Sequence, residues 1–194
     1  TELTDHLKVL YRTLAVRHCD VCGKPVLPDD PGAVIDGLLA EGPGPDGQDR
    51  RLVVTFPFHA GQGDDAEVAF RFLAREGYHR AWQDGRVVAL DTLDPTAGPW
   101  RLDIIVDRVV AREAERRRLV ETLEVAWRMG EDDATLHIEA PEEPGGFRAR
   151  QLFADRRCCG QRYPEAREGT FSFNSPLGAC PTCNGFGRVT DIDW

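Results

Sequence analysis

Cysteine is the residue type whose spacing most directly predicts chemistry in this sequence. The six cysteines lie near the two ends of the chain, and two of their three pairs have Cys-x-x-Cys spacing: Cys19, Cys22, Cys158, Cys159, Cys180 and Cys183. Two thiolates from one tight turn can bind a single tetrahedral Zn²⁺ at ~2.3 Å. Because the chain does not begin with a secretory signal pattern, this spacing favours metal over disulfides, and we expect zinc as the cofactor.

The first half of the C-terminal cysteine motif is irregular. Twenty residues separate Cys159 from Cys180, at the upper edge of the range between the halves of a four-cysteine zinc site. A regular motif would have a cysteine at position 156, where this sequence has Arg156, and its additional thiol is the adjacent Cys158. Since adjacent side chains normally point to different sides, unusual local geometry is needed for both thiols to bind one metal.

Three arrangements of the thiols therefore stay open. In the first, Cys159, Cys180 and Cys183 bind one zinc ion together with Cys158 or a non-cysteine ligand. In the second, the N-terminal Cys-x-x-Cys pair shares a site with the later thiols. In the third, no stable metal is bound. For Cys158 taken alone, the alternative to metal binding is a buried, unreactive thiol.

Catalytic patterns are missing from the sequence. His18 beside Cys19 is the one histidine that the sequence places next to a thiol, and adjacent residues rarely form a working nucleophile and base. The sequence contains no Gly-x-x-x-x-Gly-Lys-Ser/Thr loop for phosphate binding. We therefore expect no enzymatic activity from this chain.

Hydrophobic periodicity predicts the elements that position these residues. Helix-type spacing predicts an amphipathic helix over 3–14, and Pro31 begins a second helix. The remaining pattern alternates β-branched runs with amphipathic stretches, and it predicts strands at 51–58, 86–90 and 102–110 and helices at 66–76 and 113–129.

The predicted fold class is α+β, with a small mixed sheet and flanking helices beside an irregular cysteine-rich module. We divide the chain into a helix with the first cysteine turn (1–31), the sheet domain (32–147) and the cysteine-rich module (148–194).

Length and charge limit the classes of function. The 194 residues allow one compact domain or two small ones, which excludes a large multidomain enzyme. The net charge of −9 argues against a chain whose main surface binds nucleic acid, because phosphate neutralisation needs a net stripe of Lys and Arg. With no apolar run near the roughly 20 residues of a membrane span, we expect a soluble, cytoplasmic chain.

Several segments resemble a known family when taken in order. The run from Phe171 to Gly187, FSFNSPLGACPTCNGFG, is similar to the zinc-knuckle stretch of the UvrA family, the excinuclease A subunits of bacterial nucleotide excision repair. The segment from Leu10 to Gly23, the GYHR run at 77–80, the IIVDRVV run at 104–110 and the helix at 118–126 match further parts of that family in the same order. The resemblance covers nearly the whole chain.

The family resemblance implies a partner-binding role for the sheet domain. Members of the family are homodimeric ATPases that detect damaged DNA and transfer it to UvrB. The resemblance implies that this chain is a fragment whose inserted domain docks UvrB, and that the ATP-binding motifs lie outside it. We expect the isolated fragment to be a monomer. The basic residues that match the family's docking positions are Arg80 and Arg108.

The sequence differs from the family pattern at two cysteine-motif positions, and it also suggests one alternative function. Arg156 replaces the first thiol of the zinc motif, and Cys22 fills a position that is often His in the family. The alternative function is direct DNA contact by the zinc module, which is locally basic through Arg156, Arg157, Arg162, Arg167 and Arg188.

Overall fold

A computed structural model describes residues 2–44, 46–167 and 169–188. The chain divides into two compact units, which we call the cysteine unit (Thr1–Leu27 with Arg156–Trp194) and the sheet unit (Pro28–Asp155). Thr1 and residues 189–194, at the outer ends of the predicted first and third segments, lie outside the described residues. No described helix is long and apolar enough to cross a membrane.

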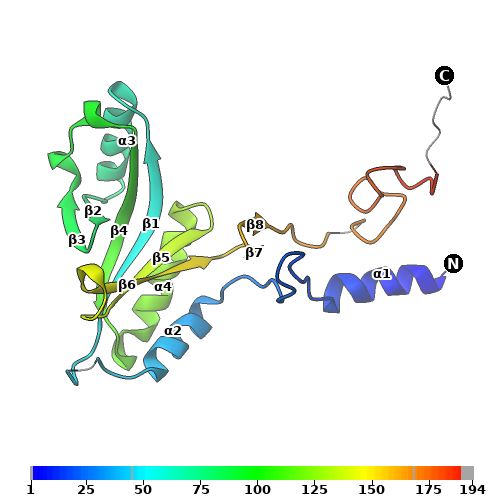
Figure 1. Cartoon of the computed structure of the whole chain (residues 1–194), viewed down its shortest axis with the longest axis horizontal. Helices are drawn as coiled ribbons and strands as arrows, with labels where there is room; N and C mark the ends of the chain where they lie inside the picture. The colour runs from blue at the N-terminus through cyan, green and yellow to red at the C-terminus, as the bar shows by residue number, and fades with distance from the viewer. Residues whose placement is uncertain (1, 45, 168, 189–194) are drawn as a thin grey trace. The chain divides into compact units, whose positions relative to one another are not determined.

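The sheet unit is built on six strands, in the order β3-β2-β4-β1-β5-β6. All five pairings are antiparallel. The α+β class is confirmed, but the expectation of a mixed sheet was wrong, because no parallel pair occurs among the described strands. The strands are β1 (Arg51–Ala60), β2 (Arg80–Gln83), β3 (Arg86–Ala89), β4 (Trp100–Val110), β5 (Asp133–Glu139) and β6 (Phe147–Phe153). Figure 1 shows the two long strands β1 and β4 side by side.

Three α-helices complete the sheet unit: α2 (Pro31–Ala40), α3 (Asp64–Arg75) and α4 (Arg116–Met129). The α2 helix begins as the sequence predicts, with Pro31 in its first turn and the Asp30 carboxylate accepting a hydrogen bond from the Ala33 N–H at 2.7 Å. Short 3₁₀ turns occur at Leu90–Thr92, Pro95–Ala97, Glu113–Glu115 and Pro144–Gly146.

The two faces of the sheet differ in what covers them. Side chains of all three helices, among them Leu38, Leu73 and Leu123, join the large hydrophobic core on one face. The opposite face, which we call the open face, carries a smaller cluster whose members all come from strands: Val53, Trp82, Ile105 and the half-buried Phe147. The open face therefore has an apolar centre that no helix supplies.

A β-bulge changes the alternation of side chains along β4. The register with β1 shifts between Val54 and Thr55, so Asp107 pairs with Val54 and Ile105 pairs with Thr55. Val109 is buried in the large core, whereas Val110 is 36% exposed. Val106 also packs against this core.

Some strands were not predicted from the sequence. The short β2 follows a glycine turn, β5 follows α4 directly, and β6 carries Arg148 and Arg150 among its exposed residues. The sheet unit consequently extends to Asp155, and β6 belongs to the sheet rather than to the cysteine-rich segment that we placed at 148–194.

The cysteine unit contains α1 (Glu2–Leu14) and a hairpin formed by β7 (Arg157–Cys158) and β8 (Gln161–Arg162). Its described buried core is small and consists of Cys19, Val26 and Tyr163, with Cys158 packed against it. The helix at the N-terminus forms as predicted, and its apolar stripe is exposed: Leu3, Leu7, Leu10, Tyr11 and Leu14.

Candidate functional site

Four cysteines from opposite ends of the sequence come together in the cysteine unit. The sulfur atoms of Cys19, Cys22, Cys158 and Cys159 all lie within 4.8 Å of one another. The Cys22 and Cys158 sulfurs are 3.4 Å apart, and those of Cys158 and Cys159 are 3.9 Å apart. Two sulfurs bound to one tetrahedral Zn²⁺ at ~2.3 Å lie roughly 3.8 Å apart. The four side chains therefore fit a zinc ion, which Cys19, Cys22, Cys158 and Cys159 would hold.

Two tight turns present these thiols. In the first, the Gly23 N–H donates to the Cys19 carbonyl at 2.9 Å, and Gly23 has a φ of 70°, a conformation that glycine adopts without strain. In the second, the turn between β7 and β8 places Cys159 at φ 49° and Gly160 at φ 75°. A left-handed Cys159 is the unusual local geometry that two adjacent thiols need to face one site.

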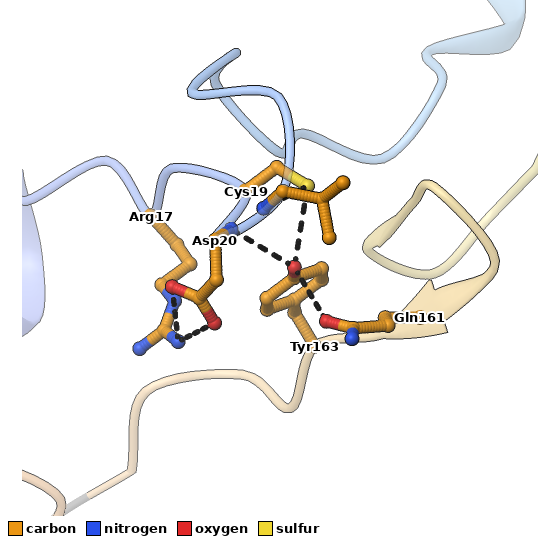
Figure 2. A network of polar contacts seen from close by, with 6 residues as sticks. Arg17, Cys19, Asp20, Gln161 and Tyr163 are labelled. Atoms are coloured by element: carbon orange, nitrogen blue, oxygen red, sulfur yellow. Dashed lines mark hydrogen bonds and ion pairs between the residues drawn. The ribbon is translucent and has the colours of Figure 1, made fainter.

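Tyr163 hydrogen-bonds to one of the four thiols (Figure 2). Its hydroxyl lies 3.3 Å from the Cys19 sulfur and 2.9 Å from the Gln161 side-chain oxygen, and it accepts a hydrogen bond from the Asp20 N–H at 3.2 Å. The Arg17 guanidinium lies 5.3 Å from the centre of the Tyr163 ring. Cys19 and Tyr163 are 3% and 6% exposed, so this contact is held away from solvent.

Neighbouring groups shift the pKa values of the clustered thiols in opposite directions. The hydrogen bond from Tyr163, helped by backbone donors, lowers the pKa of Cys19 to about 6, whereas contact with Cys22 raises the pKa of Cys158 to about 12. Contact with Cys22 also raises the pKa of Cys159. A divalent cation removes the repulsion between neighbouring thiolates, so the cluster is chemically suited to bind a metal.

Cys180 and Cys183 lie outside this cluster. Among the described residues, they join no group of three or more potential metal ligands. They sit in a separate turn, in which the Asn184 N–H donates to the Cys180 carbonyl at 2.7 Å. The fold therefore does not bring Cys159 together with Cys180 and Cys183 as one set of metal ligands. The structure instead gathers the N-terminal pair with later thiols, because the first cysteine turn packs against the β7–β8 hairpin.

The two predicted docking arginines lie on the open face. Arg108 pairs in register with Val53, and Arg80 is two residues from Trp82 on the same strand, so both share the face of the smaller cluster. Both are exposed, and neither forms an ion pair with another described residue. Each guanidinium is thus available for an acidic partner.

Arginines of the cysteine unit have other surroundings. Arg156 pairs with Glu165 at 3.4 Å, and Arg167 lines a depression of about 430 Å³ together with Arg12 and Phe171. Arg188 is exposed. Arg157 and Arg162 border the hairpin turn that presents Cys158 and Cys159. DNA contact by these five residues stays a prediction.

Sequence reasoning missed several residues of both sites. Tyr163 was not expected, and its signal is an isolated aromatic residue in a polar, turn-rich segment just after the adjacent cysteines. Trp82, Asp103 and His137 of the open face belong to strands of which two were unrecognised, so the sequence alone could not bring them together.

Comparisons with known proteins agree with this geometry. Residues 45–140 match the family model described as the UvrA interaction domain. This match covers most of the sheet unit and includes both open-face arginines, so the sheet unit is of the interaction-domain class.

Full-length relatives extend the match to the rest of the chain. "UvrABC system protein A" of Deinococcus radiodurans is 32% identical over 99% of this chain, and the protein of the same name from Thermus thermophilus is 30% identical over all of it. The corresponding protein of Methanothermobacter thermautotrophicus is 31% identical. The chain belongs to the UvrA family, and it spans about a fifth of the length of these relatives, between 19% and 20%.

Proposed function

We propose that the sheet unit docks UvrB in nucleotide excision repair, with Arg80 and Arg108 as contacts to an acidic surface of that partner. The observation that carries the proposal is the position of both exposed arginines on the open face of a domain that matches the UvrA interaction domain. The apolar centre of this face, formed by Val53, Trp82 and Ile105, supports the same role, since interfaces combine an apolar centre with a polar rim.

The cysteine unit has a structural role in this proposal. Zn²⁺ bound by Cys19, Cys22, Cys158 and Cys159 would tie the N-terminal turn to the β7–β8 hairpin, because the described buried core of this unit is small. We further propose that this chain performs no catalysis of its own, that ATP and damaged DNA are bound by the complete cytoplasmic protein, and that dimerisation belongs to it as well.

A paired charge-removal experiment tests the docking proposal. Isothermal titration calorimetry of the chain with purified UvrB should show affinity falling about 100-fold or more in the Arg80→Ala/Arg108→Ala variant, because interface arginines often contribute ~2 kcal/mol each. The matched control is Arg75→Ala/Arg128→Ala, which removes two exposed arginines from α3 and α4. Unchanged affinity in the first variant, with its fold intact by circular dichroism, would refute the assigned contacts.

A further inference from the structure

A depression on the open face combines aromatic walls with an acid. Its volume is about 310 Å³, and its lining includes Trp82, Phe147, His137, Arg101 and Asp103. The Trp82 and Phe147 rings are packed edge to face with their centres 4.9 Å apart, and the His137 ring lies 5.3 Å from Trp82. Three aromatic rings in mutual contact therefore line this depression.

The Asp103 carboxylate in this depression has no partner among the described residues. It is half-buried, and it sits directly opposite Trp82 in the β2–β4 register. Burial raises the pKa of Asp103 above its ordinary value, and no described residue hydrogen-bonds to its carboxylate. Half-burying a carboxylate without a hydrogen-bonded or charged partner costs free energy, which a cation from outside would recover.

The charges around the depression set the chemistry of its occupant. His137 is buried and hydrogen-bonded to the Thr55 hydroxyl at 3.2 Å, and burial lowers its pKa to about 4, so it carries no positive charge near neutrality. Arg101 is exposed at the margin and forms no ion pair with a described residue. Asp84 lines the same depression. Asp103 forms no ion pair with a described residue and lies beside aromatic rings, and both features attract a cation.

We infer that this depression receives a Lys or Arg side chain of the docking partner, whose charge pairs with the Asp103 carboxylate beside the Trp82 and Phe147 rings. The inference rests on the proposed docking function and adds to it a contact of opposite sign. Arg80 and Arg108 attract acidic groups of the partner, while Asp103 selects a basic one. Alternation of charge fixes the register in which two surfaces meet, and like charges in a wrong register repel.

The sign of one mutational effect tests the inference. We expect Asp103→Asn to weaken UvrB binding by the 194-residue chain about tenfold in calorimetry, because the partner's cation then loses its counter-charge. If the open face meets only acidic groups, removal of a negative charge at Asp103 will strengthen binding instead. Glu124→Gln is the matched control, since it neutralises an exposed acid on α4 and should leave the affinity unchanged.

A second variant tests whether the aromatic rings that line the depression contribute to UvrB binding. Binding of UvrB by the unmodified chain distinguishes failure of the docking proposal from failure of the contact proposed for Asp103. Phe147→Leu keeps an apolar side chain but removes one ring, and it should weaken binding several-fold. Thermal unfolding of each variant verifies that the sheet unit is folded. Unchanged or tighter binding by Asp103→Asn overturns this inference while the docking proposal stands. If the unmodified chain does not bind UvrB at all, the docking proposal itself fails.

Discussion

The two units of this chain differ in the size of their described hydrophobic cores. The sheet unit buries a large cluster of aliphatic and aromatic side chains between one face of its sheet and three helices. The described buried core of the cysteine unit holds three residues, beside which four thiols lie within 4.8 Å of one another. A small polar unit cannot bury enough apolar surface to offset chain entropy, so it needs a covalent or metal link.

This difference in core size also bears on which unit binds a partner. The sheet unit can present a partner-binding face because hydrophobic burial on one side leaves the other side open. In our proposal, the four clustered thiols of the cysteine unit stabilise that unit itself. Metal loss should therefore disturb one unit and not the other, and core mutations should do the reverse.

Metal removal gives the largest expected difference between the units. Structural zinc sites supply ~10–16 kcal/mol of apparent binding free energy, so chelation should unfold the cysteine unit and leave the sheet unit folded. Two-dimensional ¹⁵N–¹H spectra before and after chelator treatment will follow both units in one sample. Uniform loss of signal dispersion across the sheet unit would contradict the separation.

Cysteine variants sharpen this test by distinguishing between the possible ligand sets. Cys22→Ser should lower the zinc content of chelator-washed, reloaded protein well below one ion per chain, whereas Cys180→Ser should leave it unchanged, because Cys180 lies outside the four-thiol cluster. Atomic absorption measures both. The reverse ranking would restore the ligand set that includes Cys180 and Cys183.

Truncation of a core side chain in α4 should destabilise the sheet unit and leave the cysteine unit unaffected. Leu123 is 0% exposed, and Leu123→Ala should lower the free energy of unfolding of the sheet unit by about 3 kcal/mol through lost burial and a cavity. Urea titration followed by tryptophan fluorescence measures this change. Leu14→Ala, at a side chain that is 71% exposed, is the control and should change stability by less than about 0.5 kcal/mol. Equal effects would contradict the assigned core.

Acid should selectively destabilise the sheet unit through His137. Burial lowers the pKa of this residue to about 4 from an ordinary value of 6.5. Between these two pH values the unfolded chain takes up a proton that the folded chain does not, so stability is full above pH 6.5 and falls towards pH 4, by about 2–3 kcal/mol. His137→Gln should remove this part of the pH dependence in urea titrations, whereas the exposed His59→Gln should retain it. An unaltered profile in His137→Gln would show that burial of this ring is not the cause.

The smallest expected effect concerns Tyr163. Tyr163→Phe keeps the packed ring and removes the hydroxyl that contacts the Cys19 sulfur, so we expect zinc release to a competing chelator to accelerate about fivefold, equivalent to ~1 kcal/mol. The charge-transfer band of the Co²⁺-substituted protein should also shift, because a hydrogen bond to sulfur changes the energy of that band. Tyr78→Phe in the sheet unit is the control. An identical charge-transfer band in Tyr163→Phe would contradict a hydrogen bond from Tyr163 to the metal-binding sulfur of Cys19.

The sheet unit was more predictable from sequence than the cysteine unit. Local periodicity predicts α2, α3, α4 and the long strands, since each has its own buried stripe. It missed β2, β5 and β6, and it could not show the bulge that turns Val109 rather than Val110 inward, because these depend on pairing with distant strands.

The cysteine cluster shows the limit of motif spacing. The Cys-x-x-Cys pattern identified candidate ligands, but it pairs neighbours in sequence. The fold instead joins Cys19 and Cys22 to Cys158 and Cys159 across more than one hundred intervening residues, through the left-handed turn at Cys159 and the packing of Tyr163. Neither contact has a local signature.

Hydrogen–deuterium exchange of the chain with and without UvrB tests most directly where partner binding resides. We expect slower exchange on UvrB addition in β2 and β4, the strands that carry Arg80, Asp103 and Arg108, and unchanged exchange in residues 156–188. Protection confined to residues 156–188, with none in β2 and β4, would contradict the assignment of docking to the open face.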